Sequence, residues 1–373
     1  MHNRLDDIKE TLLMGPGPSC VFPEVYRALG RPTLGHLDPA FIALMDEIKT
    51  LLQQAMGTKN NVTLPISGTG SAGMETCLVN LIEPGDAVLA LVNGVFGARM
   101  VDVAGRLGAA VDKIDFEWGA PVIPERVESQ LKAKSYKIVA VVHAETSTGV
   151  ANPIADLKPM VKANGALFLV DCVTSLGGMP VTMDAWGADA VYSGTQKCLS
   201  CPPGLSPVSF SDAAVARLQS RKSRVPNWYL DLSMIINYWG GGAKRVYHHT
   251  APINMLYGLY QSLLCLMSEG LENSFARHQQ QHQALVAGLE SMGLSMLVAK
   301  RCRLPMLNAV KVPEGVDEAA VRKQLLEKDA IEIGAGLGPL AGKIWRIGLM
   351  GHTARAENVH RVLAALRGAV SIK

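Results

Sequence analysis

Between residue 62 and about residue 210, short apolar segments alternate with segments of helical spacing. A strand–helix–strand alternation places parallel strands side by side with helices outside them, so it predicts an α/β protein with a mostly parallel sheet. Such sheets bind ligands at the carboxyl ends of their strands. The chain has 373 residues, 48% of them hydrophobic, which is enough to bury a large core. The expected strands are Val88–Val92, Ile138–His143, Ala166–Val170 and Ala190–Tyr192.

Three parts are expected along the chain. Residues 1–25 are rich in glycine and proline and predict an irregular arm. Residues 26–268 are expected to form a large domain that contains the sheet, and residues 269–373 a smaller C-terminal α/β domain. Near the start of the large domain, Asp38 is a good N-cap for a helix with Pro39 at its first position. Further helical sequence is expected at 251–292, 317–328 and 356–368, with strands at Leu307–Val312 and Ile344–Ile347.

The charge of the chain is nearly balanced, with 36 Lys and Arg against 33 Asp and Glu, a net charge of +3. This small excess does not indicate a nucleic acid or an anionic membrane as partner. No run of about 18 apolar residues is present, so no membrane span is expected. The first residues lack the apolar centre of a secretory signal, and the last three, Ser371-Ile372-Lys373, differ from a peroxisomal signal. We therefore expect a cytoplasmic protein.

Seven cysteines are scattered along the chain, a pattern typical of a reducing compartment. Cys198 and Cys201 form a C-x-x-C pair, but no second pair lies at the spacing of a zinc site. The adjacent His248 and His249 likewise have no further ligands near them in the sequence. We expect no metal site, and we interpret the two cysteines as small residues of a loop.

Two polar residues follow neighbouring apolar segments in a way that predicts cofactor chemistry. Asp171 follows one expected strand, and Lys197 lies in a turn of small residues after another. Singly, an acid after a strand is often a helix cap, and most lysines are solvated. Together they supply what pyridoxal 5'-phosphate (PLP) requires: an amine that forms a Schiff base with the aldehyde, and a carboxylate that keeps the pyridine nitrogen protonated. The same amine would act as general base at the substrate Cα.

Several motifs occur in the order of a known family. The runs Val170–Gly178, Ser193–Lys197 and Pro202–Gly204 resemble the class V aminotransferases of PLP fold type I, in particular the alanine–glyoxylate and serine–pyruvate aminotransferase branch. The resemblance extends from Gly15 to Gly348. It implies the α/β architecture of the PLP-dependent transferase fold type I, with a large domain and a smaller C-terminal one. It also implies PLP as the cofactor and a homodimer as the active form.

The resemblance also assigns cofactor contacts. The glycine-rich stretch Ser67–Ser71 enters a helical segment, and the free N–H groups at such a helix start bind phosphate. Where animal relatives carry a histidine in this stretch, this chain has Ser71. By resemblance, Tyr247 and Thr250 clamp the phosphate of the partner subunit. The other expected cofactor-binding residues are Thr69, Gly70, Ser71 and Gln196 near the phosphate, Phe96 stacked on the ring, Thr146 at the phenolic oxygen, and Asp171 and Val173 at the ring.

Two residues are expected at the substrate. Arg346 lies in an apolar strand, where a guanidinium needs an anion, and an α-carboxylate offers a planar match with two hydrogen bonds. The alternative is a structural ion pair with an internal acid. By resemblance, the backbone around Gly17 covers the substrate. His143 is interpreted as a structural histidine.

The resemblance implies a transaminase that moves an amino group from alanine or serine to glyoxylate or pyruvate. No second arginine is placed at the site by the sequence, which disfavours aspartate or glutamate as donor. Ureidoglycine–glyoxylate and pyridoxamine–pyruvate transamination are alternatives, the second because Asp38–Phe41 and Lys197–Leu199 resemble that branch. A class V lyase or desulfurase would need a reactive cysteine, for which Cys302 is the candidate. A non-catalytic PLP-fold binding module is disfavoured by Lys197 and Asp171.

Overall fold

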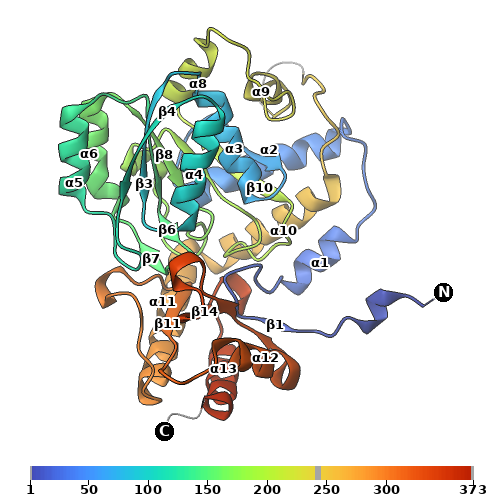
Figure 1. Ribbon diagram of the computed structural model, residues 1–373. Helices are drawn as coiled ribbons and strands as arrows, with labels where there is room; N and C mark the ends of the chain where they lie inside the picture. Colours follow the sequence, from blue (N-terminus) through green and yellow to red (C-terminus); the bar gives the residue numbers. More distant parts are fainter. Residues whose placement is uncertain (1, 240–244, 371–373) are drawn as a thin grey trace.

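The computed structural model describes residues 2–239 and 245–370, and a seven-stranded sheet forms the centre of this part (Figure 1). The strand order is β2-β10-β9-β8-β5-β3-β4, and only β10 runs antiparallel to its neighbours. All four strands expected in this region form, each within one residue of its expected ends. The strands are β2 (Val62–Ser67), β3 (Ala87–Val92), β4 (Ala110–Asp115), β5 (Ile138–Val142), β8 (Leu167–Asp171), β9 (Ala190–Tyr192) and β10 (Leu205–Phe210).

Helices cover both faces of this sheet, with α5 and α6 on one side and α3 and α4 on the other (Figure 1). The expected helix start is confirmed in α2, where the Asp38 carboxylate accepts a hydrogen bond from the Ala40 N–H and Pro39 is the first helical residue. The helices around the sheet are α1 (Pro23–Leu29), α2 (Pro39–Met56), α3 (Gly70–Leu81), α4 (Val95–Arg106), α5 (Pro124–Ala133), α6 (Ile154–Asn164), α7 (Met183–Trp186), α8 (Asp212–Gln219), α9 (Leu232–Trp239) and α10 (Ile253–Glu269).

A smaller three-stranded sheet and three helices follow. The long helical sequence expected at 251–292 consists of two helices, because Gly270 (φ +86°) interrupts it between α10 and α11. A second hydrophobic core lies between this sheet and its helices, separate from the core around the large sheet. The domain boundary at 268/269 stays a prediction. The elements are α11 (Leu271–Ser291), β11 (Leu307–Lys311), α12 (Glu318–Asp329), β13 (Gly334–Ala335), β14 (Ile344–Gly348) and α13 (Ala356–Ala369).

The N-terminal segment differs from the irregular arm expected from its composition. Residues Leu12–Leu13 form a short strand, β1, which pairs in parallel with β12 (Ile331–Glu332). Leu12 and Met14 are buried in the core of the C-terminal part, which also contains Ile331 and Ile347, more than 300 positions away in the chain. A two-residue strand leaves no periodic pattern in a sequence, so only the fold reveals this pairing.

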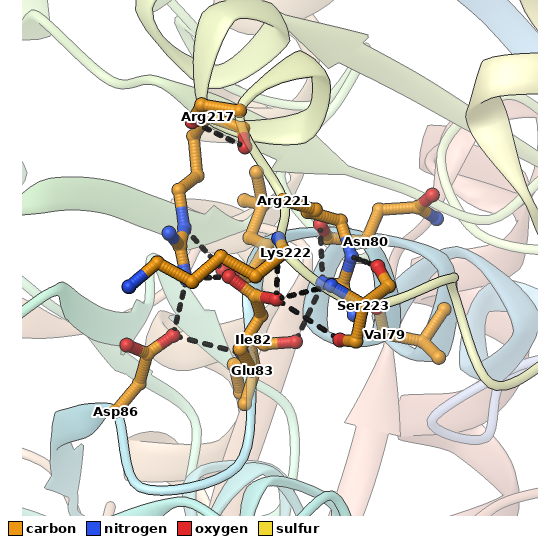
Figure 2. Close-up of polar contacts among 11 residues, drawn as sticks. Val79, Asn80, Ile82, Glu83, Asp86, Arg217, Arg221, Lys222 and Ser223 are labelled. Carbon is orange, nitrogen blue, oxygen red and sulfur yellow. Dashed lines mark hydrogen bonds and ion pairs between the residues drawn. The ribbon is translucent and has the colours of Figure 1, made fainter.

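The far end of α3 is held by side chains from α8 and the loop after it (Figure 2). Arg221 Nη1 donates hydrogen bonds to the carbonyl oxygens of Val79, Asn80 and Ile82 at 3.3, 3.0 and 2.6 Å. The Glu83 carboxylate accepts hydrogen bonds from the backbone of Lys222 and Ser223 and from the Ser223 hydroxyl. A cation at a helix C-terminus satisfies open carbonyls and complements the helix dipole. This contact fixes α3, whose other end enters the site described below.

Replacing Arg221 by methionine is expected to destabilise the protein, because three carbonyl groups lose a charged donor. Hydrogen bonds to charged groups contribute about 1.5–3 kcal/mol, so a decrease of roughly 2–4 °C in Tm is expected for a chain of 373 residues. Thermal denaturation followed by circular dichroism measures this change. The exposed neighbour Lys222 contributes only its backbone N–H to the contact, so Lys222→Ala is the control. Equal melting temperatures of the two variants would contradict the role given to Arg221.

Candidate active site

A pocket of about 140 Å³ lies at the carboxyl ends of the parallel strands of the large sheet. Its wall comes from the turns and loops after β2, β3, β5, β8 and β9, as the sequence predicts for such a sheet. Nine of the residues predicted for the site line this one pocket. They are Thr69, Gly70, Ser71, Phe96, Thr146, Asp171, Val173, Gln196 and Lys197.

Lys197 lies at the centre of the site, in the turn that follows β9. It is only 8% exposed, and burial, with a further effect of the Arg346 charge, lowers the pKa of its amine to about 8. The ammonium donates a hydrogen bond to the Pro16 carbonyl oxygen of the N-terminal segment. A Cβ atom on Gly17 would lie 2.5 Å from the Lys197 Nζ, and Gly17 has a positive φ of +104°. The segment therefore covers the lysine closely only because residue 17 has no side chain.

Asp171 is the last residue of β8 and is buried at the base of the pocket. Burial raises the pKa of its carboxyl to about 6, although two hydrogen bonds oppose this effect. The Val173 N–H donates to Oδ1 and the Tyr192 hydroxyl donates to Oδ2, both at 2.7 Å. Tyr192 also lines the pocket, and sequence reasoning missed its role. Its only signal would have been its place opposite Asp171 on the neighbouring strand, which requires the strand order.

The glycine-rich turn after β2 leads directly into α3, which starts at Gly70. Thr69, the N-cap residue, makes no side-chain hydrogen bond to the helix, so the first N–H groups of α3 remain available at the pocket. Arg99, on α4, lies over the Phe96 ring at 5.1 Å and donates to the Ser71 hydroxyl at 3.5 Å. Arg99 also lines the pocket and was not anticipated from the sequence. This end of the pocket is built to hold an anion.

Two further polar groups face the pocket. The Thr146 hydroxyl contacts the Thr174 hydroxyl, and both residues are buried. The buried Gln196 Oε1 has no hydrogen-bond partner among residues 2–239 and 245–370. Buried polar atoms are rarely left unpaired, so a polar group of a ligand is expected beside it. An amine, a carboxylate, a ring face and a helix start around one cavity fit the aldehyde, pyridine and phosphate groups of PLP.

Arg346 lies on β14, next to the pocket wall. It is 6% exposed, and burial lowers the pKa of its guanidinium to about 10. Its Nε donates to the Ala335 carbonyl at 2.7 Å and its Nη1 to the Thr146 carbonyl at 3.3 Å. Within the described part of the chain, no carboxylate lies within 4.0 Å of this guanidinium. The structural ion pair considered as the alternative is therefore not formed at contact distance in that part, and the Glu145 charge, which raises the pKa of this guanidinium, acts from farther away.

Tyr247 and Thr250 are not brought to the pocket of their own chain. Both are exposed, and their hydroxyl groups lie 3.3 Å apart on the surface. The loop that carries them is attached to the glycine-rich turn, because His249 Nε2 and the Ser67 hydroxyl are hydrogen-bonded at 3.2 Å. His248 and His249 contact each other through their Nδ1 atoms at 2.8 Å. In the described residues, no group of three or more His, Cys, Asp or Glu side chains is arranged to hold a metal ion.

The remaining candidates lie outside the pocket. His143 is buried edge-on against Trp186, with ring centres 4.7 Å apart, and burial lowers its pKa to about 4. Cys198 and Cys201 are buried free thiols, and burial raises the pKa of each to about 12. Cys302, the candidate for lyase chemistry, packs in a small apolar cluster with Val150 and Val298. None of the four lines the pocket.

This fold and this pocket define a PLP-dependent transferase of fold type I. The model of the aminotransferase class-V family matches residues 22–361, and the chain belongs to this family. It is 42% identical over 365 residues to alanine–glyoxylate aminotransferase of Callithrix jacchus, covering 97% of this chain and 88% of that protein. It is 40% identical over 372 residues to (S)-ureidoglycine–glyoxylate transaminase of Bacillus subtilis, covering 95% and 89%. The crystal structure of alanine–glyoxylate aminotransferase from Nostoc sp. matches with a TM-score of 0.95 and 46% identity, covering 100% of both chains.

Proposed function

We propose that this aminotransferase moves an amino group from alanine or serine to glyoxylate or pyruvate. The observation that carries the proposal is the buried Arg346 guanidinium, which lies beside the pocket and has no carboxylate partner in the described residues. A buried guanidinium without an anion is costly, and the α-carboxylate of a small substrate supplies that anion with two parallel hydrogen bonds. The names of the relatives, which specify glyoxylate as a substrate, support this choice.

The residues around the pocket divide the work of the reaction. Lys197 would hold PLP through a Schiff base, and the cofactor, once the substrate amine has displaced Lys197 from it, would supply an electron-accepting ring that stabilises negative charge at the substrate Cα. The released Lys197 amine, whose pKa is lowered to about 8, would then take and return the proton at that carbon. Asp171 would hold the pyridine nitrogen, Phe96 and Val173 would contact the ring, and Thr146 would donate to the phenolic oxygen. Thr69, Gly70 and Ser71 at the start of α3 would bind the phosphate, with Gln196 beside them.

The charges near the pocket favour a substrate with a single carboxylate. Arg346 is held by the Ala335 and Thr146 carbonyls, and Thr146 lines the pocket. Arg99 lies at the other end, beside Ser71, where the phosphate is placed. A dicarboxylate donor would need a second guanidinium near the first. The same phosphate end of the pocket argues against free pyridoxamine as a substrate, because that compound has no phosphate.

We also propose that the enzyme is a homodimer whose partner subunit completes the phosphate site. Four large side chains are exposed on and around the loop that carries Tyr247, namely Trp228, Tyr229, Val246 and Tyr247 itself. The Trp228 and Tyr229 rings contact His248 and His249 of this loop. A patch of this kind on a soluble enzyme is typical of a subunit contact. The hydroxyl groups of Tyr247 and Thr250 would reach the phosphate of the partner.

The free thiols support a reducing compartment such as the cytoplasm. No helix in the described residues is long and apolar enough to cross a membrane.

A panel of amino donors tests the proposed substrates. Purified protein with PLP is mixed with alanine, serine, (S)-ureidoglycine, pyridoxamine, aspartate or glutamate, each against glyoxylate and pyruvate. We expect kcat/KM for alanine or serine with glyoxylate to exceed that for aspartate by at least about 100-fold, the value of one lost charged pair. A preference for (S)-ureidoglycine or pyridoxamine would replace this assignment with one of the alternatives. A preference for aspartate would refute the claim that only Arg346 is available to bind a substrate carboxylate.

Removing both hydroxyl groups of the loop, with Tyr247→Phe and Thr250→Val, is expected to weaken PLP binding by at least about 100-fold, since two hydrogen bonds to a charged group are lost. Equilibrium dialysis of PLP measures this change. Tyr229→Phe, in the same exposed patch, is the control and should leave the Kd unchanged. Sedimentation velocity tests the assembly itself, and a stable monomer with full activity would contradict the shared site.

A further inference from the structure

Tyr192 makes a contact that the proposed mechanism does not use. In the parallel pairing of β8 and β9, Tyr192 is the residue opposite Asp171. Its side chain is 1% exposed and lines the pocket, and its hydroxyl group donates to Asp171 Oδ2 at 2.7 Å. The Val173 N–H donates to the other oxygen, Oδ1, also at 2.7 Å. The carboxylate is therefore held from two sides by donors on two different segments.

This arrangement limits what the carboxylate can do. Each carboxylate oxygen has two lone pairs, and one on each oxygen is already used. Rotation about the Cβ–Cγ bond of Asp171 would break both hydrogen bonds, so the remaining lone pairs keep a fixed direction. Burial raises the pKa of this carboxyl group, and both donors oppose that effect by favouring the ionised form. Burial also keeps the Tyr192 phenol protonated by raising its pKa well above the ordinary value, so it remains a donor.

We propose that Tyr192 is a positioning residue that orients the Asp171 carboxylate, favours its ionised form, and thereby keeps the proton on the pyridine nitrogen of PLP. This inference rests on the proposed function, which places the pyridine nitrogen at Asp171. The effect passes entirely through Asp171. Tyr192 sets where the shared proton resides, and so how strongly the ring accepts electrons, without being the proton donor or acceptor in the reaction.

The test replaces one hydroxyl group in the holoenzyme. Tyr192→Phe keeps the ring that fills this position and removes only the donor. Loaded with PLP that is ¹⁵N-labelled at the pyridine nitrogen, the variant should show a ¹⁵N resonance displaced toward neutral pyridine. Its kcat should fall by about 10–100-fold, the effect of one hydrogen bond to a charged group. Fluorotyrosine at position 192 is a stronger donor than tyrosine and should displace the resonance in the opposite direction.

Tyr136→Phe is the matched control. The Tyr136 hydroxyl donates to Asp112 Oδ2 at the same distance of 2.7 Å, but neither residue lines the pocket. Its removal should leave both the ¹⁵N resonance and kcat unchanged. An unchanged resonance in Tyr192→Phe would overturn the inference, even if that variant melts at a lower temperature, because a purely structural role would not move the proton.

A double-mutant cycle with Asp171→Asn separates this inference from the proposed function. If Tyr192 acts through Asp171, Tyr192→Phe should change kcat by less than about 2-fold in the Asp171→Asn background. Additive losses would overturn the positioning role. If Asp171→Asn alone leaves the resonance and kcat unchanged, the placement of the pyridine nitrogen at Asp171 is wrong, and the inference falls with it. A large effect of Asp171→Asn with no effect of Tyr192→Phe refutes the inference alone.

Discussion

Replacement of Lys197 by alanine is expected to lower the multiple-turnover kcat by at least about 10³-fold, because in the proposed mechanism one amine both attaches PLP and moves the proton at the substrate Cα. PLP should still bind, since the helix start of α3 and Asp171 are unchanged. The rate constants with alanine and glyoxylate measure the loss. Borohydride reduction followed by peptide mapping locates the attachment, and an adduct on another lysine would refute the assignment. Lys113, an exposed lysine paired with Asp115, is the control position.

The lowered pKa of Lys197 has a consequence for pH. A group with a pKa of about 8 is uncharged at pH values where a solvated lysine, with a pKa of 10.5, is still protonated. Only the uncharged amine attacks an aldehyde, so the rate at which the apoprotein attaches PLP should rise with pH and level off above about pH 8. Stopped-flow absorbance measures this rate. A rise that continues past pH 9 would indicate an amine without a depressed pKa.

Arg346→Lys is expected to leave cofactor absorbance intact and to weaken amino acid and oxo acid substrates alike. Lysine keeps the charge but cannot form two parallel hydrogen bonds with a carboxylate. The loss of such a contact costs about 2–5 kcal/mol, or roughly 30-fold to several-thousand-fold in kcat/KM. Steady-state kinetics with alanine, serine and glyoxylate measure the effect, and an amine without a carboxylate should be affected far less.

The control for Arg346 is Arg322→Lys on α12. Arg322 forms an ion pair with Glu318 in the same part of the chain and lies outside the pocket. Its replacement should leave kcat/KM within about 2-fold, because neither Arg322 nor its partner Glu318 lines the pocket. If Arg346→Lys behaves like this control with all three substrates, Arg346 is structural and the carboxylate binds elsewhere.

Residues with local patterns were predictable from the sequence. The strands are continuous apolar runs, and Asp171 and Lys197 follow two of them directly, so their meeting at one edge follows from the rule for parallel sheets. The helix start at Gly70 was visible as a glycine-rich turn before a helical segment. These features depend on residues that are close to one another in the chain, so the sequence alone is enough to predict them.

Residues whose role depends on distant partners were not predictable. Tyr192 matters because β9 lies beside β8, and Arg99 because α4 brings it over Phe96 and next to Ser71. Tyr247 and Thr250 were expected at the phosphate only by resemblance. In the structure they lie on the surface, outside the pocket of their own chain. The pairing of β1 with β12 joins segments separated by most of the sequence.

The N-terminal segment contacts two separate parts of the proposed site. The Met14 carbonyl accepts a hydrogen bond from the Gly348 N–H, two residues after Arg346, while Pro16 and Gly17 lie against Lys197. The same short segment thus contacts both the strand of Arg346, the proposed carboxylate site, and Lys197, the proposed catalytic amine. A shift of β14 is therefore expected to move the residues that cover Lys197. Binding of the substrate carboxylate at Arg346 should therefore also change the position of Pro16 and Gly17 over Lys197. Hydrogen exchange that slows at residues 344–348 but not at residues 12–17 when substrate binds would show that the two are uncoupled.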